Sequence, residues 1–165
     1  MKHLYFIMLL TLCSCSEAQN PTTFSKEALS DVMIGIDGSK TNFSKIIEKF
    51  KGKKVVIEIW ASWCGDCIKG MPKVKSLQKE YSEVVYLFLS VDKDIASWKR
   101  GVRKYELKGE HYFLPGGWDS DFNEFIDLSW IPRYMVVDTI GEIQLFKAIK
   151  ASDKKLEISI KGEYK

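Results

Sequence analysis

Cysteine and histidine are scarce in this chain, which limits the kinds of site it can hold. The four cysteines form two separate pairs, Cys13 with Cys15 and Cys64 with Cys67, too few for a framework of several disulfides. A structural zinc site needs four ligands, and the only histidine beyond the first few residues is His111. We therefore expect no metal centre and no cofactor.

Strong net charge and long apolar runs are also missing. The net charge is only +3, whereas a nucleic-acid-binding protein carries a strongly basic stripe on its surface, so we expect no nucleic-acid partner. The apolar run within residues 1–12 is well short of the about 20 residues that a membrane-spanning helix needs. Hydrophobic residues make up 45% and charged residues 28% of the chain, a balance that supports one core of single-domain size.

The N-terminus has the layout of an export signal. Lys2 precedes the apolar run, and Cys15 follows a small residue in a pattern similar to a bacterial lipobox, whose cysteine becomes the lipidated N-terminus. Cleavage after Ala18 is the alternative, because small residues also stand at the required places there. These features predict export to the periplasm or another part of the cell envelope, with a lipid anchor in the membrane. The chain then has three parts: a leader over residues 1–15, a polar tether over 16–30 and a folded domain over 31–165.

Hydrophobic periodicity predicts alternating strands and helices. Residues 55–60 and 84–91 are almost continuously apolar, which indicates strands buried on both faces. Residues 71–81 and 95–105 carry apolar side chains at helical spacing. The order predicts an α/β domain whose central mixed sheet has helices on both faces. The other predicted elements are a strand over 31–36, a helix capped at 41 or 42 and extending through 50, a loop over 109–119, a short helix near 122–126, an antiparallel hairpin of 134–137 with 143–149, and a helix from 152.

Cys64 and Cys67 stand where the buried strand 55–60 gives way to a helix. Such a pair is either half of a zinc site or a redox couple, and the other zinc ligands are missing. A disulfide that closes so small a loop adds little stability, so a purely structural bond is not favoured. At a helix N-terminus, unpaired N–H groups and the helix dipole stabilise a Cys64 thiolate as nucleophile, while Cys67 attacks the mixed disulfide. Asp66 opposes thiolate formation and leaves the direction of electron flow open.

The segment VVIEIWASWCGDC, residues 55–67, resembles the active-site strand and motif of the thioredoxin superfamily. It is most similar to the exported thiol-disulfide oxidoreductases of the TlpA/ResA type. Glu58, Pro72 and the Ile131–Pro132 dipeptide match further positions of that family's pattern. The resemblance extends over residues 31–152 and is weakest over 92–130. It implies a thioredoxin-like fold.

The resemblance also implies roles for individual residues. Glu58 would lie beneath the dithiol and accept the proton of Cys67; the alternative is a structural or solvent-facing residue. Pro132 would be cis and face the sulfurs, leaving the backbone of Ile131 to pair with an extended partner segment, whereas a turn proline is usually trans. Trp63 would shield the cysteine pair and offer an apolar contact to a substrate protein.

These features predict a thiol-disulfide oxidoreductase that reduces protein disulfides in the cell envelope. A membrane electron donor would then reduce its Cys64–Cys67 disulfide again. An oxidising compartment makes such a supply of electrons necessary. Two alternatives within the enzyme class are a disulfide-donating oxidase or isomerase and, less favoured, a peroxidase. From a different class, the same fold and thiolate pair could hold copper or zinc as a metallochaperone.

Overall fold

A mixed seven-stranded sheet runs through the middle of the molecule in the order β2-β1-β5-β4-β3-β6-β7. The structure, a computed structural model, describes residues 20–162. Within that range, no helix combines the length and the apolar content that crossing a membrane requires. The elements in chain order are α1 (Lys26–Ser30), β1 (Val32–Gly35), β2 (Lys40–Asn42), α2 (Phe43–Lys49), β3 (Val55–Trp60), α3 (Gly65–Glu80), β4 (Val85–Ser90), α4 (Ile95–Tyr105), β5 (Glu110–Phe113), η1 (Gly117–Asp119), α5 (Asp121–Phe125), β6 (Arg133–Val137), β7 (Ile143–Ala148) and α6 (Lys154–Lys161).

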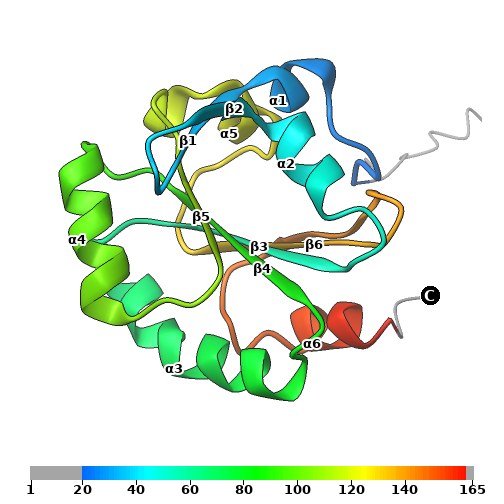
Figure 1. The fold of residues 1–165 in the computed structure, drawn as a ribbon. Coiled ribbons are helices and arrows are strands. Elements are labelled where there is room, and N and C mark those ends of the chain that lie inside the picture. Colours follow the sequence, from blue (N-terminus) through cyan, green and yellow to red (C-terminus); the bar gives the residue numbers. More distant parts are fainter. Residues whose placement is uncertain (1–19, 163–165) are drawn as a thin grey trace, which may run out of the picture.

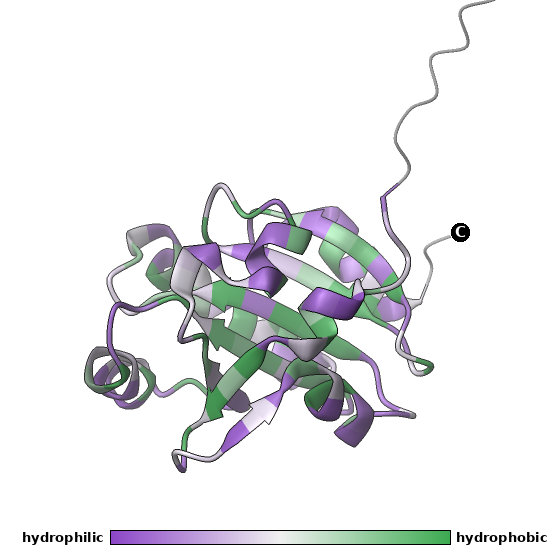
Figure 2. Cartoon of the chain, turned by 90° about the horizontal axis from the view of Figure 1, so that it is seen from above, coloured by the Kyte–Doolittle hydropathy of each residue, from purple (hydrophilic) through white to green (hydrophobic). Residues whose placement is uncertain are grey.

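Strand β3 lies at the centre of the fold, and all six of its side chains are buried. It pairs in parallel with β4 and antiparallel with β6. Helices α3 and α6 cover one face of the sheet, and α1, α2 and α5 lie on the other (Figure 1). Hydrophobic residues gather on the central strands and hydrophilic ones on the surrounding helices and loops (Figure 2). The predicted α/β fold, with a mixed sheet between two helical layers, is confirmed.

Helix α3 begins at Gly65 because Cys64, the residue before it, caps its N-terminus. The backbone of Cys64 is extended, with φ −75° and ψ 105°, and its sulfur accepts a hydrogen bond from the Cys67 N–H. Met71, Val74 and Leu77 form the buried stripe that holds the helix on the sheet. Pro72 lies within the helix but outside this stripe. The N-terminus of α3 is thereby fixed at the end of β3.

The predicted tether over residues 16–30 is wrong in its last part, because Lys26–Ser30 forms helix α1. Ser25 caps this helix, and Ala28 is fully buried. Phe24 packs its ring 4.9 Å from the Phe43 ring, centroid to centroid. Phe24, Ala28 and the partly buried Leu29 dock this otherwise polar segment on the core. The described part of the domain therefore includes residues that precede 31.

The predicted loop over 109–119 is wrong at its start, where Glu110–Phe113 forms β5. This strand pairs in parallel with β4 and antiparallel with β1. Its alternating burial, with His111 and Phe113 inside, is a strand pattern that the following Pro-Gly-Gly turn obscures in the sequence. The three-residue strand β2 was not predicted either. It pairs antiparallel with β1 and is too short to leave a periodic signal.

Candidate active site

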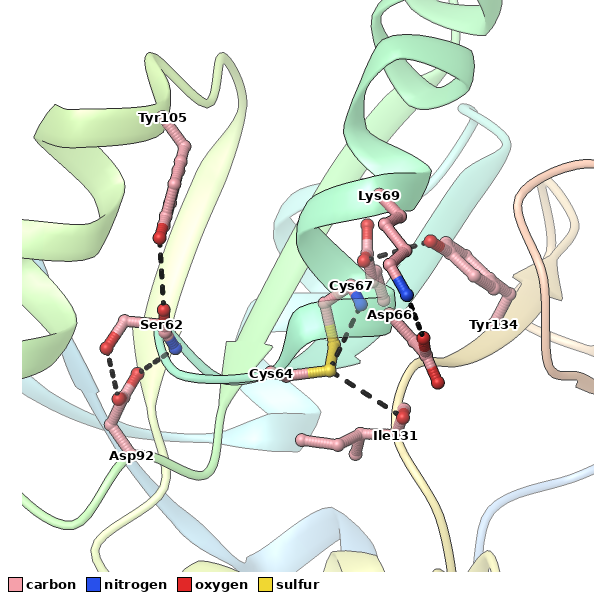
Figure 3. The surroundings of a disulfide bond; sticks show 10 residues. Ser62, Cys64, Asp66, Cys67, Lys69, Asp92, Tyr105, Ile131 and Tyr134 are labelled. Atoms are coloured by element: carbon pink, nitrogen blue, oxygen red, sulfur yellow. Dashed lines mark hydrogen bonds and ion pairs between the residues drawn. A yellow bond between two sulfur atoms is a disulfide. The ribbon is translucent and has the colours of Figure 1, made fainter.

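The two cysteines of the first turn of α3 form a disulfide in the structure. Their Cα atoms are 5.3 Å apart. The Cys67 N–H donates to Cys64 Sγ at 3.1 Å, and Cys64 is 5% exposed while Cys67 is fully buried (Figure 3). In the reduced state the same N–H and the helix N-terminus stabilise negative charge on the Cys64 sulfur. Cys64 is thus the sulfur that an incoming partner reaches, and Cys67 lies behind it.

Asp66 lies on the exposed side of the same turn. Its carboxylate is 3.5 Å from the ammonium of Lys69, and both side chains are largely exposed. An ion pair exposed to solvent interacts weakly. It nevertheless places the positive charge of Lys69 beside the Asp66 carboxylate, whose negative charge opposes formation of the Cys64 thiolate. Lys69 therefore offsets part of the effect of Asp66 on Cys64.

The segment facing Cys64 comes from the loop before β6. The Ile131–Pro132 peptide bond is cis, the isomer that the resemblance implies. The carbonyl oxygen of Ile131 lies 3.7 Å from Cys64 Sγ, and both residues of the dipeptide are buried. Sequence analysis missed Arg133, whose fully buried guanidinium donates to the carbonyl oxygens of Ile126 and Asp127 at 2.6 and 3.1 Å. These bonds tie the start of β6 to the preceding loop.

Two tryptophans next to these segments are exposed. Trp63, directly before Cys64, is 56% exposed, and Trp130, directly before Ile131, is 58% exposed. Exposed apolar side chains mark a contact surface where several of them gather beside a site. The two tryptophans add apolar area to a surface that also carries the charged side chains of Asp66 and Lys69.

Glu58 is buried in the middle of β3, so its interpretation as a solvent-facing residue is wrong. It is 3% exposed and stands opposite Tyr134 in the β3–β6 register. The Tyr134 hydroxyl donates to Glu58 Oε1 at 2.9 Å, while Oε2 has no hydrogen-bond partner among residues 20–162. Burial raises the pKa of Glu58 to about 8, against the opposing effect of the tyrosine hydrogen bond. A carboxyl group with this pKa exchanges protons near neutral pH.

The burial of Glu58 has a consequence for stability that can be measured with the disulfide intact. Between its ordinary pKa of 4.5 and about 8, the folded state keeps a proton that the unfolded state releases. The contribution of Glu58 to stability is therefore greatest below pH 4.5 and falls by about 1.4 kcal/mol per pH unit as pH rises through this window. Urea unfolding between pH 5 and pH 9 should show this slope in the native chain and lose it in Glu58→Gln. An identical slope in both chains would contradict the assignment.

Sequence analysis also missed Asp92, which fixes the loop that leads into Cys64. The buried Asp92 carboxylate accepts hydrogen bonds from the Ser62 N–H at 3.0 Å, the Ser62 hydroxyl at 2.6 Å and the Ser90 hydroxyl at 2.8 Å. The Tyr105 hydroxyl donates to the Ser62 carbonyl oxygen at 3.3 Å (Figure 3). An acidic residue directly after a buried apolar strand is the signal that could have found Asp92.

His111 packs inside the sheet. His111 is buried on β5, where it stacks on Phe88 with ring centroids 5.0 Å apart. Across residues 20–162, no three side chains of the His, Cys, Asp and Glu types gather as a metal site would require. The predicted lipidation site Cys15 and the alternative cleavage site at Ala18 lie outside the described residues.

Comparisons with known proteins agree with this geometry. The Redoxin family model matches residues 24–157. The chain is 28% identical over 145 residues to the thioredoxin-like protein YneN of Bacillus subtilis, covering 86% of this chain and 76% of that protein. It is 34% identical over 85 residues to the thiol-disulfide oxidoreductase ResA of Bacillus thuringiensis, covering 50% of this chain and 47% of ResA.

A solved structure matches the fold. The thioredoxin domain of a thiol-disulfide oxidoreductase from Bacteroides vulgatus superposes with a TM-score of 0.69, covering 91% of this chain and 100% of that one. At 19% identity, this likeness concerns the fold alone. The match to ResA spans about half the length of that protein.

Proposed function

The chain belongs to the redoxin family, and from that premise we propose that it reduces protein disulfides in the cell envelope through Cys64 and Cys67. The observation that carries the proposal is the arrangement of the pair. Cys64 caps α3 and accepts the Cys67 N–H, while Cys67 is fully buried behind it. Cys64 is thus suited to attack the substrate disulfide, and Cys67 is suited to attack Cys64 and release the substrate.

The reaction takes two thiol-disulfide exchanges. The Cys64 thiolate attacks one sulfur of the substrate disulfide, whose S–S bond breaks and releases the other sulfur as a thiolate. The Cys67 thiol then gives its proton to the Glu58 carboxylate and attacks Cys64 Sγ. The bond between Cys64 and the substrate breaks, the Cys64–Cys67 disulfide forms, and the second substrate sulfur leaves as a thiolate. Two electrons have passed from the cysteine pair to the substrate.

The groups around Cys64 support the binding of an extended substrate segment. The Ile131 backbone lies beside Cys64 Sγ, where a partner strand that crosses the sulfur can hydrogen-bond to it. The cis Pro132 directs this backbone segment, and Trp63 offers apolar contact area at the edge. We therefore assign substrate binding to Trp63 and Ile131, with Pro132 shaping the surface.

The proposed location rests on the N-terminal sequence. Residues 1–15 contain the export leader and its lipidation site, and Cys15 becomes the lipid-bearing N-terminus that attaches the domain to a membrane once the residues before it are removed. Because the envelope is oxidising, a membrane dithiol donor must reduce the Cys64–Cys67 disulfide after each cycle. Intact-mass analysis of the mature protein distinguishes lipidation at Cys15 from cleavage after Ala18.

A protein-disulfide assay tests the activity itself. The dithiothreitol-reduced chain is expected to reduce insulin faster than dithiothreitol alone, because the Cys64 thiolate is available at neutral pH. Titration of the same reduced chain with copper and zinc measures the competing metallochaperone function. Sub-micromolar metal binding without insulin reduction would overturn the proposal.

A further inference from the structure

Tyr134 makes a direct contact with Glu58, the proposed proton acceptor. It lies on β6, two residues after Pro132, and its hydroxyl donates to Glu58 Oε1 at 2.9 Å. Tyr134 is 1% exposed, so the hydrogen bond is shielded from water. Figure 3 shows the Tyr134 side chain extending from the strand toward the turn of α3 that carries Cys67.

The tyrosine hydroxyl is also enclosed from the side of α3. Gly70 lies one helical turn after Cys67, and a Cβ atom at this position would be only 3.3 Å from the Tyr134 hydroxyl and 3.7 Å from the Ala151 Cβ. The helix backbone therefore rests almost directly on the hydroxyl because residue 70 has no side chain. This packing leaves the phenol little room to swing away from Glu58.

The rest of the environment of Glu58 is apolar. A cavity of about 10 Å³ between the sheet and helices α3 and α6 is lined by Glu58, Tyr134, Tyr86 and six apolar residues. The titratable side chains that line this cavity beside Glu58 are Tyr134 from β6 and Tyr86 from β4. The Tyr86 hydroxyl makes no hydrogen bond to any residue in the described range. Within that range, Tyr134 supplies the hydrogen bond that orients the carboxylate. The apolar lining residues are Val56, Val74, Leu77, Leu87, Phe88 and Leu156.

We propose that Tyr134 is the positioning residue for Glu58: by holding Oε1, it keeps Oε2 turned to receive the proton of Cys67. The inference rests on the proposed function, in which Glu58 is the proton acceptor. In the transfer, the S–H bond of Cys67 breaks and an O–H bond forms at Oε2, while Tyr134 keeps its own proton. Burial and the nearby Glu58 charge raise the pKa of Tyr134 above its ordinary value, so the phenol stays a donor.

Tyr134→Phe removes the hydroxyl and leaves the ring. A hydrogen bond to a carboxylate favours its charged form, so its loss raises the pKa of Glu58. The pH midpoint of the resolving step should move up by about 1 unit, and the rate at pH 7 should fall about tenfold. Tyr86→Phe is the matched control, because it removes a buried hydroxyl from the same face of the sheet. It should leave the midpoint unchanged.

The resolving step is measured by stopped-flow absorbance. The reduced chain carrying Cys13→Ser and Cys15→Ser reacts with Ellman's reagent; Cys64 releases the first thionitrobenzoate, and the attack of Cys67 releases the second. The rate of the second release is recorded against pH. Tyr134→Phe should shift this profile, and should change nothing further when added to Glu58→Gln.

The outcomes distinguish a failure of the role proposed for Glu58 from a failure of the role proposed for Tyr134. If Glu58→Gln keeps the native profile, the role of Glu58 in the proposed function fails and that of Tyr134 fails with it. If Glu58→Gln loses the pH dependence and Tyr134→Phe keeps it unshifted, only the role of Tyr134 is overturned. Equal changes in Tyr134→Phe and Tyr86→Phe would show a packing effect and also overturn it. Should Tyr134→Phe not fold, Gly70→Ala serves as the second variant. Its methyl group would lie 3.3 Å from the hydroxyl, so the hydroxyl must give way by a few tenths of an ångström and the midpoint should rise; no shift would overturn the proposal.

Discussion

Cys64→Ser should reduce insulin no faster than the reaction without protein. A serine hydroxyl does not ionise near neutral pH and cannot form the mixed disulfide, so the first exchange never begins. The expected loss is complete, because every later step passes through the sulfur of Cys64. Insulin turbidity in the presence of dithiothreitol measures it.

A double variant, Cys13→Ser with Cys15→Ser, is the matched control for the loss of activity. It removes the other cysteine pair and should keep full activity in the purified protein. The free energy of unfolding of Cys64→Ser should stay close to that of the native chain, since the disulfide closes a very short loop. Residual activity in Cys64→Ser would mean that another sulfur is the nucleophile.

Cys67→Ser should convert the enzyme into a trap. The Cys64 thiolate still attacks a substrate disulfide, but no second sulfur lies behind it to complete the exchange. The covalent complex with the substrate should therefore accumulate as a band on a non-reducing gel that disappears on reduction. Mass spectrometry of the band identifies the captured protein and should map its mixed disulfide to Cys64.

The control for trapping is the double variant Cys64→Ser with Cys67→Ser, which should capture nothing. If Cys67→Ser forms no adduct, or if the adduct persists without Cys64, the order of attack proposed for the two cysteines is wrong. Adducts with several envelope proteins would indicate broad substrate use, and one dominant adduct would indicate a dedicated partner.

The position of the cysteine pair could be predicted because its signals are local. The apolar run of β3 and the helical spacing after Cys67 fix a strand-to-helix junction from consecutive residues alone. The buried acid Glu58 stands out in the same run. These features lie within one short stretch of chain, so the central part of the fold and the reactive pair follow from it.

The partners of Glu58 and Ser62 could not be predicted in this way. Tyr134 meets Glu58 only through the β3–β6 register, and Asp92 meets Ser62 across the ends of β3 and β4. Neither contact leaves a periodic signal, because it depends on which strands are neighbours. The short strand β5 was missed for a related reason, since its pairing with β4 and β1 is not visible in the sequence and its own alternation covers only four residues before the Pro-Gly-Gly turn.

The reduction potential of the Cys64–Cys67 pair tests most directly the claim that the protein is a reductant. The chain is equilibrated in dithiothreitol or glutathione redox buffers, and the fraction of free thiol is read by alkylation and mass spectrometry. We expect a potential near the thioredoxin value of about −270 mV. A potential near about −120 mV would contradict it, because a pair so oxidising donates its disulfide to substrates instead of reducing theirs.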